Sequence, residues 1–202
     1  MGTLLQINSS ILGGQGQSSQ LADAFVAQWL AQNPDGRVIK RDLALTPVPH
    51  LDGERFQALL TAPERRDAAQ RAVAAYSDAL IAELRAADTL VIGLPLYNFG
   101  TPSSLKAYFD HVARAGVTFR YTATGPEGLL DDRPTYVVAA RGGLYAGTAA
   151  DLQTGFIRNF LGFVGIRSVE FVYAEGLNID AATRETALAR AQSDLQALLA
   201  AS

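Results

Sequence analysis

Residues 89–110, TLVIGLPLYNFGTPSSLKAYFD, decide the fold of this chain because they join a strand, an aromatic loop and a helix. The run TLVIG at residues 89–93 is short, apolar and followed closely by Pro, as in a strand buried on both faces. We expect Thr101 to cap the following helix and Pro102 to occupy its first turn, where no N–H is needed. Apolar residues then recur at helical spacing: Leu105, Tyr108, Phe109 and Val112.

The loop between this strand and this helix is the first candidate for a binding site. It contains Tyr97, Asn98 and Phe99. In open α/β sheets, ligands bind beyond the carboxyl ends of the strands, where this loop must lie. Two aromatic side chains flanking an amide suit a flat ligand that also needs an edge-on hydrogen bond. The alternative is a turn that carries ordinary core aromatics.

The composition limits the class of protein. The 202 residues suffice for one domain with a full core. A net charge of -3 argues against nucleic acid or an anionic membrane as the main partner. The absence of cysteine excludes disulfides, thiolate catalysis and Cys-based metal sites, and it fits a cytoplasmic protein. No apolar run approaches the ~20 residues of a membrane span, and no signal peptide is expected.

A second candidate site follows the first predicted strand, residues 3–7. Residues 8–20, NSSILGGQGQSSQ, are uncharged and rich in hydroxyls, amides and glycine. We expect Ser18 or Ser19 to cap the next helix, whose apolar residues are Leu21, Phe25, Trp29 and Leu30. A strand, a Gly/Ser loop and a helix N-terminus together favour an anion such as phosphate.

Several interpretations of this loop stay open. A Walker A loop is excluded because Gly-Lys-Ser/Thr is absent. A dinucleotide fingerprint is half present: Gly14 and Gly16 fit, Ser19 replaces the third glycine, and Asp42 could bind a ribose. A terminal phosphate monoester would instead be held by Ser10, Gln17 and Ser18. The remaining alternative is a surface loop that binds nothing.

The rest of the chain alternates strands with helices. We predict strands at residues 37–42, 136–140 and 169–173, and helices at residues 64–86, at residues 151–163 with Leu152, Phe156, Phe160 and Phe163 on one side, and after a cap at Asp180. This alternation predicts a three-layer α/β sandwich around a five-stranded parallel sheet in the order 2-1-3-4-5. We expect one domain over residues 1–202, with insertions near residues 43–65, a lid, and 115–133, a hairpin.

The strand order brings three loops to one edge of the sheet. The Ser/Gly loop and the aromatic loop follow neighbouring strands, and Arg141-Gly142-Gly143 directly follows the next one. Two glycines at this place let backbone N–H groups approach a ligand closely, although a simple turn is the alternative. The sequence therefore predicts one site, with a phosphate at the first loop and a ring at the other two.

The motifs of the chain resemble a known family. In order they are SSIL at residues 9–12, QS at 17–18, PLYNF at 95–99, ARAGVTFRY at 113–121, RGG at 141–143 and FLGF at 160–163. Together they are similar to the bacterial FMN-dependent NADH-azoreductases, also described as FMN-dependent NADH:quinone oxidoreductases. The resemblance covers nearly the whole chain.

The resemblance implies a flavodoxin-like homodimer with one FMN per subunit and NADH or NADPH as the electron donor. By position, Ser10, Gly16, Gln17 and Ser18 would hold the FMN phosphate. The ring would meet Pro95, Leu96, Tyr97, Asn98 and Phe99 and, at its pyrimidine edge, Ala140, Arg141, Gly142 and Gly143. Tyr121 and Phe163 match aromatic residues on the substrate side.

The chain also departs from the pattern of the family. Gly16 stands where relatives often carry Ser, Leu96 replaces a common Met, and Ala140 replaces a hydroxyl residue. Residues 43–65 match least, and we expect them to influence the choice of nicotinamide and substrate.

The expected reaction needs no catalytic side chain, because a flavin carries the chemistry. We expect a ping-pong transfer of two electrons from the nicotinamide to a quinone or an azo compound. The alternatives are a flavodoxin-like electron carrier, a flavin-independent NAD-binding dehydrogenase that uses Gly14, Gly16 and Asp42, and a nucleotide-binding regulator. No metal site is expected, and His50 and His111 are interpreted as surface or packing residues.

Overall fold

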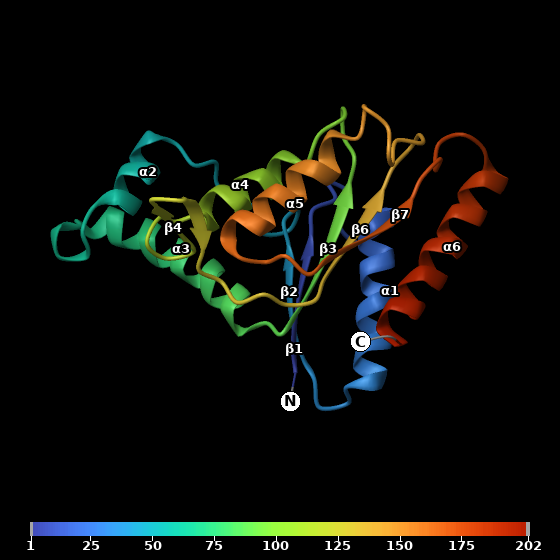
Figure 1. Cartoon of the computed structure of the whole chain (residues 1–202), viewed down its shortest axis with the longest axis horizontal. Coiled ribbons are helices and arrows are strands. Elements are labelled where there is room, and N and C mark those ends of the chain that lie inside the picture. Colours follow the sequence, from blue (N-terminus) through green and yellow to red (C-terminus); the bar gives the residue numbers. More distant parts are fainter. Residues whose placement is uncertain (1, 201–202) are drawn as a thin grey trace.

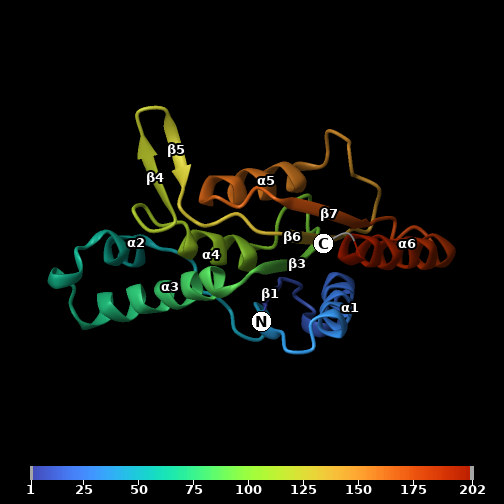
Figure 2. The ribbon, with the colours of Figure 1, turned by 60° about the horizontal axis from the view of Figure 1, so that its bottom comes forward.

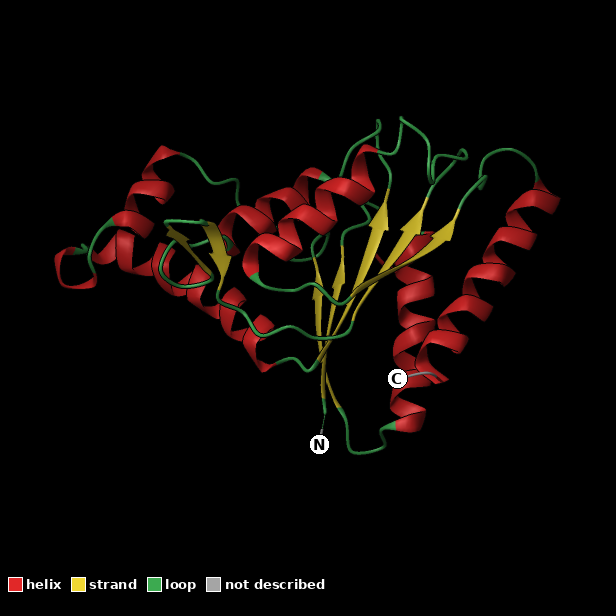
Figure 3. Ribbon diagram, in the orientation of Figure 1, coloured by secondary structure: helices red, strands yellow, loops and turns green. Residues whose placement is uncertain are grey.

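The computed structural model describes residues 2–200, and a five-stranded parallel sheet in the order β2-β1-β3-β6-β7 lies at its centre (Figures 1 and 3). Its strands are β1 (Thr3–Asn8), β2 (Arg37–Asp42), β3 (Thr89–Pro95), β6 (Thr135–Ala140) and β7 (Val169–Ala174). In sequence order of these five strands, the arrangement is 2-1-3-4-5. The predicted flavodoxin-like topology is therefore confirmed, and each predicted strand lies within two residues of an observed one.

Helices cover both faces of this sheet. They are α1 (Gln17–Gln32), α3 (Ala68–Ala86), α4 (Ser103–Val112), α5 (Leu152–Val164) and α6 (Ala181–Ala200). One core joins α1 and α6 to inward side chains such as Leu4 and Val91, and the other joins α3, α4 and α5 to side chains such as Leu5 and Ile92. Alternate residues of β1 and β3 thus face opposite cores, which explains why both strands are mostly apolar, with Gln6 and Asn8 of β1 as buried polar exceptions.

Two segments stand apart from the sandwich. The short helix α2 (Gly53–Leu60) packs on α3, and a 3-10 turn, η2 (Pro63–Arg65), follows it. The strands β4 (Phe119–Thr122) and β5 (Gly125–Gly128) form the predicted hairpin, an antiparallel pair that projects away from the central sheet (Figure 2). Gly128 and Gly165 lie against each other so closely that a Cβ on Gly128 would overlap the backbone of Gly165. This close approach fixes the base of the hairpin against the end of α5.

The predicted caps of two helices are wrong. Gly16 is the N-cap residue of α1, and no side chain caps this helix. Ser18 and Ser19 lie one and two residues inside it, and both are fully buried. At α4 the N-cap residue is Pro102, and the Thr101 hydroxyl is buried without a hydrogen-bond partner. Both helices therefore begin with N–H groups that no side chain of the described chain caps.

Helix α3 begins at Ala68, four residues later than predicted. The Asp67 side chain accepts a hydrogen bond from the Gln70 N–H, and the Gln70 side-chain Oε1 accepts one from the Asp67 N–H. This capping box fixes the start of the helix more strongly than the charge pattern that suggested residue 64. At the last helix the predicted cap is confirmed, because Asp180 accepts the N–H of Thr183 at 2.8 Å.

The predicted apolar side of α5 is only partly covered. Leu152 is 65% exposed, and Phe156, Phe160 and Phe163 are half-buried. The neighbouring row enters the core instead, with Gln153, Ile157, Leu161 and Val164. A similar exception occurs in α1, where Leu30 is 36% exposed. A row of aromatic surface on α5 is thus left for a further contact. Among residues 2–200, no helix is long and apolar enough to cross a membrane.

Candidate functional site

Three loops meet beyond the carboxyl ends of neighbouring strands, at the arrowhead end of the sheet in Figure 3. The first loop follows β1 and contains a 3-10 turn, η1 (Gly13–Gln15); the second follows β3, and the third follows β6. The predicted convergence is therefore present in the fold. Hydrogen bonds also link the loops directly, since the Leu96 N–H donates to the Ala140 carbonyl at 3.1 Å and the Ile11 N–H to the Tyr97 hydroxyl at 3.3 Å.

The first loop is folded around two buried serines. The Ser9 hydroxyl donates to the Gly93 carbonyl at 2.7 Å, which ties the loop to β3. The Ser10 hydroxyl accepts the Leu12 N–H at 3.2 Å and lies 3.3 Å from the Tyr97 hydroxyl. Ser10 therefore connects the first loop to the aromatic loop.

Gly16 is required by this packing. A Cβ on Gly16 would overlap the Ser10 side chain. The space that a residue-16 side chain would need is thus taken by the hydroxyl of Ser10. The structure thus gives a reason for glycine at position 16.

The beginning of α1 collects unpaired donors. The first helical hydrogen bond runs from the Gln20 N–H to the Gly16 carbonyl, so the N–H groups of Gln17, Ser18 and Ser19 have no helical acceptor. The hydroxyls of Ser18 and Ser19 are buried and have no partner among residues 2–200. Buried polar groups are normally paired. An anion with several oxygen atoms, such as a phosphate, fits these donors and the positive end of the helix.

Asp42 lies near this loop but is engaged. It is buried, and its Oδ1 accepts the Ala44 N–H at 2.9 Å. A Cβ on Gly13 would approach its Oδ2 at 3.8 Å. The carboxylate is therefore committed to the turn after β2, which disfavours the interpretation of Asp42 as a ribose-binding acid.

The aromatic loop contains a strained two-residue turn. Asn98 and Phe99 have φ values of +49° and +63°. The turn is closed by hydrogen bonds from the Tyr97 N–H to the Gly100 carbonyl at 3.3 Å and from the Gly100 N–H to the Tyr97 carbonyl at 2.9 Å. A bulky residue in the left-handed region is unfavourable, and such strain concentrates at functional sites. The turn presents the Phe99 ring, which is 53% exposed.

Gln153 of α5 supports this turn, and its role was not predicted from the sequence. Its amide donates to the Pro95 carbonyl at 2.8 Å and to the Gly100 carbonyl at 3.3 Å, and the residue is 1% exposed. The only sequence signal for it is a glutamine at helical spacing from the apolar residues Ile157, Leu161 and Val164.

The side chain of Arg141, in the third loop, is buried in the protein and does not face a ligand. Its guanidinium is fully buried, forms ion pairs with Asp151 at 2.9 Å and Glu175 at 3.1 Å, and lies 4.9 Å from the centre of the Tyr173 ring. Burial opposes ionisation of Asp151, but hydrogen bonds from Arg141 and Thr154 outweigh it and hold the pKa of this carboxyl below its usual range. The backbone of Arg141 is also engaged, because its N–H donates to the Ala174 carbonyl at 2.9 Å and its carbonyl accepts the Leu177 N–H at 3.1 Å.

The two glycines that follow are shaped for close approach. A Cβ on Gly142 would lie 2.6 Å from Asn178 Nδ2, and one on Gly143 would lie 2.9 Å from the Tyr145 ring. Their carbonyls accept the N–H groups of Asn178 and Gly176, each at 3.0 Å. Their own N–H groups donate to no group in the described part of the chain. The loop therefore offers free donors to a ligand.

Tyr121 and Phe163 are not brought to these loops. Tyr121 is on the hairpin and 75% exposed. Phe163 lies ten residues after Gln153 in α5, which is about 15 Å along the helix axis. The Phe119 ring lies between them, with ring centres 5.6 Å from Tyr121 and 4.2 Å from Phe163. Within one chain they form a separate aromatic cluster.

A cavity of about 330 Å³ opens beside the aromatic turn, on the side of α4 and α5. It is lined by Phe99, Gly100, Thr101, Lys106, Leu152, Gln153 and Phe156. The partly covered row of α5 thus begins at this cavity, with Leu152 and Phe156, and ends at Phe163 in the Tyr121 cluster.

The two histidines lie elsewhere. His50 is exposed in the loop before α2. His111 is buried in α4, its Nε2 lies 3.0 Å from the Pro49 carbonyl, and burial lowers its pKa. His111 therefore packs the lid segment against α4, as a structural residue.

Comparisons with known proteins agree with the fold and cover almost the whole chain. The family described as "Flavodoxin-like fold" matches residues 2–199. The chain is 56% identical over 201 residues to an FMN-dependent NADH:quinone oxidoreductase of Cellvibrio japonicus (strain Ueda107), covering 100% of both chains. It is 53% identical over 194 residues to the protein of the same name from Alcanivorax borkumensis, covering 96% of this chain and 98% of the other.

Solved structures also agree with this fold. An azoreductase from Bacillus anthracis str. Sterne has a TM-score of 0.89 at 27% identity, with 98% of this chain and 99% of the other covered. An FMN-dependent NADH-azoreductase from Bacillus anthracis str. Ames Ancestor, in complex with FMN, has a TM-score of 0.87 at 25% identity, with 98% and 100% covered.

Proposed function

The chain belongs to the flavodoxin-like family of FMN-dependent NADH:quinone oxidoreductases, and we propose that it transfers two electrons from NADH or NADPH to quinones and aromatic azo compounds by a ping-pong mechanism. The observation that carries the proposal is the meeting of three loops at one edge of the sheet. One loop offers donors for a phosphate, one presents aromatic residues, and one offers free backbone N–H groups.

The residues fit an FMN in one orientation. Ser10, Gln17 and Ser18 would hold the phosphate, and Gly16 would leave room for Ser10. The ring would lie on residues 95–99, and its pyrimidine edge would meet the backbone of residues 140–143. When bound, FMN supplies the group that accepts and returns the electron pair. The chain would bind and orient it.

The chemical contribution of the chain lies in the third loop. The N–H groups of Gly142 and Gly143 would donate to the pyrimidine edge, where negative charge grows on reduction. Donors that are already oriented stabilise such charge without reorganisation. The charge of the buried Arg141 guanidinium is balanced by Asp151 and Glu175, so the backbone N–H groups are the donors that this loop offers. No side chain is needed as a nucleophile or a base.

The proposal includes a homodimer. The α5 row of Leu152, Phe156, Phe160 and Phe163 leaves an apolar surface on each chain, and Phe99 is exposed beside it. A second copy packed on this row would cover it and bring its own Tyr121 and Phe163 toward the aromatic turn. These two residues would then line the substrate side. The absence of cysteine fits the proposed cytoplasmic location.

The lid and the hairpin are proposed as insertions in a single domain over residues 1–202. In the lid, Arg55 pairs with Asp52, and Arg66 donates to the carbonyls of Ala58 and Thr61. The exposed Arg65 side chain has no hydrogen bond within residues 2–200. Of these three arginines, Arg65 is therefore the one that we propose to meet a nicotinamide phosphate.

Steady-state kinetics test the ping-pong mechanism. If nicotinamide and acceptor occupy the same face in turn, double-reciprocal plots at several quinone concentrations will be parallel. Intersecting lines would mean that both substrates bind together, which contradicts a shared site. An azo dye tested against the same NADH series asks whether both acceptor classes use this site: each should competitively inhibit reduction of the other.

A further inference from the structure

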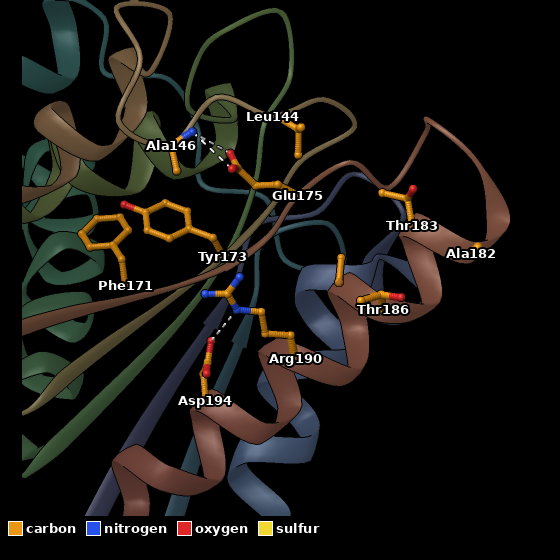
Figure 4. A pocket seen from close by; sticks show the side chains of 11 residues that line it. Leu144, Ala146, Phe171, Tyr173, Glu175, Ala182, Thr183, Thr186, Arg190 and Asp194 are labelled. Atoms are coloured by element: carbon orange, nitrogen blue, oxygen red, sulfur yellow. Dashed lines mark hydrogen bonds and ion pairs between the residues drawn. The ribbon is translucent and has the colours of Figure 1, made fainter.

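Glu175 lies directly after β7 and faces the back of the third loop. Its Oε1 accepts the N–H groups of Tyr145 at 3.0 Å and Ala146 at 2.9 Å. Its Oε2 lies 3.2 Å from the Ala146 nitrogen, and Figure 4 shows the contacts between Glu175 and Ala146. The same Oε1 accepts from the Arg141 guanidinium at 3.1 Å. Three donors from one loop therefore converge on one carboxylate.

This carboxylate is not among the residues that line the cavity beside the aromatic turn. Glu175 lines a separate groove of about 770 Å³ between the loop, β7 and α6, together with Leu144 and Ala146. Figure 4 shows it pointing toward Ala146 from the strand side of this groove. Glu175 thus has no direct contact with a ring that lies on residues 95–99.

The bonds of Glu175 also affect the preceding residues of the loop, Gly142 and Gly143. Glu175 accepts the N–H groups of Tyr145 and Ala146. The carbonyls of Gly142 and Gly143 accept the N–H groups of Asn178 and Gly176 in the turn after β7. These bonds fix the backbone conformation of the loop. The N–H groups of Gly142 and Gly143 are the ones that remain without an acceptor. Because Glu175 fixes the backbone that follows them, it also fixes the direction of these two N–H groups.

We propose that Glu175 is a positioning residue of the flavin site, which orients the free N–H groups of Gly142 and Gly143 toward the pyrimidine edge of FMN. This inference rests on the proposed function. It predicts that Glu175 affects the affinity for reduced FMN more than that for oxidised FMN, because the oriented donors act on the negative charge of the reduced form.

The test compares Glu175→Leu with Glu170→Leu. Glu170 lies on β7, the strand that Glu175 follows, and its exposed side chain has no hydrogen bond within the described chain, so it controls for the change of net charge. For Glu175→Leu we expect FMN to bind about tenfold more weakly, and the affinity for the reduced form to fall about another tenfold. The midpoint potential of bound FMN should then drop by about 30 mV, the value of a tenfold change for a two-electron couple. Glu170→Leu should match the wild type in both.

Two further variants separate positioning from general stability. Glu175→Gln keeps an acceptor without the charge and should restore most of the affinity and potential; it also serves if Glu175→Leu does not fold. Asp151→Asn breaks the other ion pair of Arg141 and keeps an oxygen that can accept the Thr154 N–H at the N-cap of α5. It should lower Tm yet leave the potential within a few millivolts of the wild type.

The outcomes are distinguishable. Wild-type FMN affinity and potential in Glu175→Leu would overturn the positioning role and leave the proposed function standing. Equal shifts of potential in Glu175→Leu and Asp151→Asn would overturn it too, because the effect would then follow the Arg141 ion pairs. A wild-type protein that fails to bind FMN would overturn the proposed function and this inference together.

Discussion

The two ends of the central sheet differ in whether their polar groups have hydrogen-bond partners. At the amino end, Asp132 accepts the N–H groups of Arg167 and Ser168 at 2.7 and 2.9 Å and the Ser168 hydroxyl at 2.7 Å. The buried Arg133 donates to the carbonyls of Leu84 and Ala87 at the end of α3. The polar side chains of this segment are paired with groups from other elements, and they tie the end of α3 and the loop before β7 to the start of β6.

At the carboxyl end, donors are left open. The Ser18 and Ser19 hydroxyls are buried without partners, the N–H groups of Gly142 and Gly143 are free, and Phe99 is held in a strained conformation. Unpaired buried groups and strain both lower stability. This difference fits the proposed site: the amino end would serve folding and the carboxyl end would serve binding. Changes at the two ends should therefore affect different measurements.

The largest expected effect is at the amino end. Arg133→Met should lower the free energy of unfolding by about 3 kcal/mol, because it removes several hydrogen bonds and leaves buried carbonyls unpaired. Thermal unfolding of the apo protein measures this loss. FMN affinity, corrected for any unfolded fraction, should stay within twofold of the wild type. A large loss of FMN affinity in the folded variant would break the division between the two ends.

The next effect is at the carboxyl end. Gly16→Val should weaken FMN binding about 100-fold, or about 2.7 kcal/mol, because its side chain would displace Ser10 from the first loop. Fluorescence titration of the apo protein with FMN measures this change. Gly14→Ala is the matched control, since a Cβ on Gly14 has no atom within 4 Å. Equal losses in both variants would contradict the special role of Gly16.

A smaller effect should separate stability from binding at one residue. Phe99→Gly should raise the stability of the apo protein by about 1 kcal/mol, because glycine adopts a positive φ without strain. The same variant should raise the KM for quinone several-fold, because the exposed ring is lost. Thermal unfolding and steady-state kinetics measure the two changes. A less stable apo protein would show that the turn is not strained in solution.

The smallest effect is the pH dependence of the amino end. Hydrogen bonds from Ser168 and Arg167 hold the pKa of Asp132 at about 2, below its ordinary value. A lowered folded-state pKa stabilises the fold above the unfolded-state pKa, and this stability is lost as pH falls through the folded value. Because Asp132 is exposed, we expect Asp132→Asn to cost about 0.5 kcal/mol at pH 6. Denaturant unfolding should show the difference shrinking between pH 5 and pH 2; a constant difference would contradict this origin.

The sequence predicted the sheet well for a simple physical reason. Strands buried on both faces are short apolar runs, and the loops that follow neighbouring parallel strands must meet at one edge. The candidate loops around Ser10, Phe99 and Gly142 were therefore found from the sequence. Their convergence did not depend on any detail of side-chain packing.

The side chains that support the site could not be found in this way. Gln153 lies 58 residues from its acceptor Pro95, and Glu175 lies 34 residues from its donor Arg141. The helix starts were missed because Gly16 and Asp67 take the N-cap positions where other residues fitted the pattern equally well. The burial of the Arg141 side chain also depends on partners from α5 and β7. Local patterns carry no information on such distant partners.

One measurement tests the central claim most directly. The purified protein is mixed with FMN, desalted, and its visible absorption is recorded before and after NADH is added without oxygen. The account predicts a retained flavin band that bleaches with NADH and returns when a quinone is added. A retained band that NADH does not bleach would indicate an electron carrier instead. Loss of the flavin on desalting would contradict the assignment of the three loops as an FMN site.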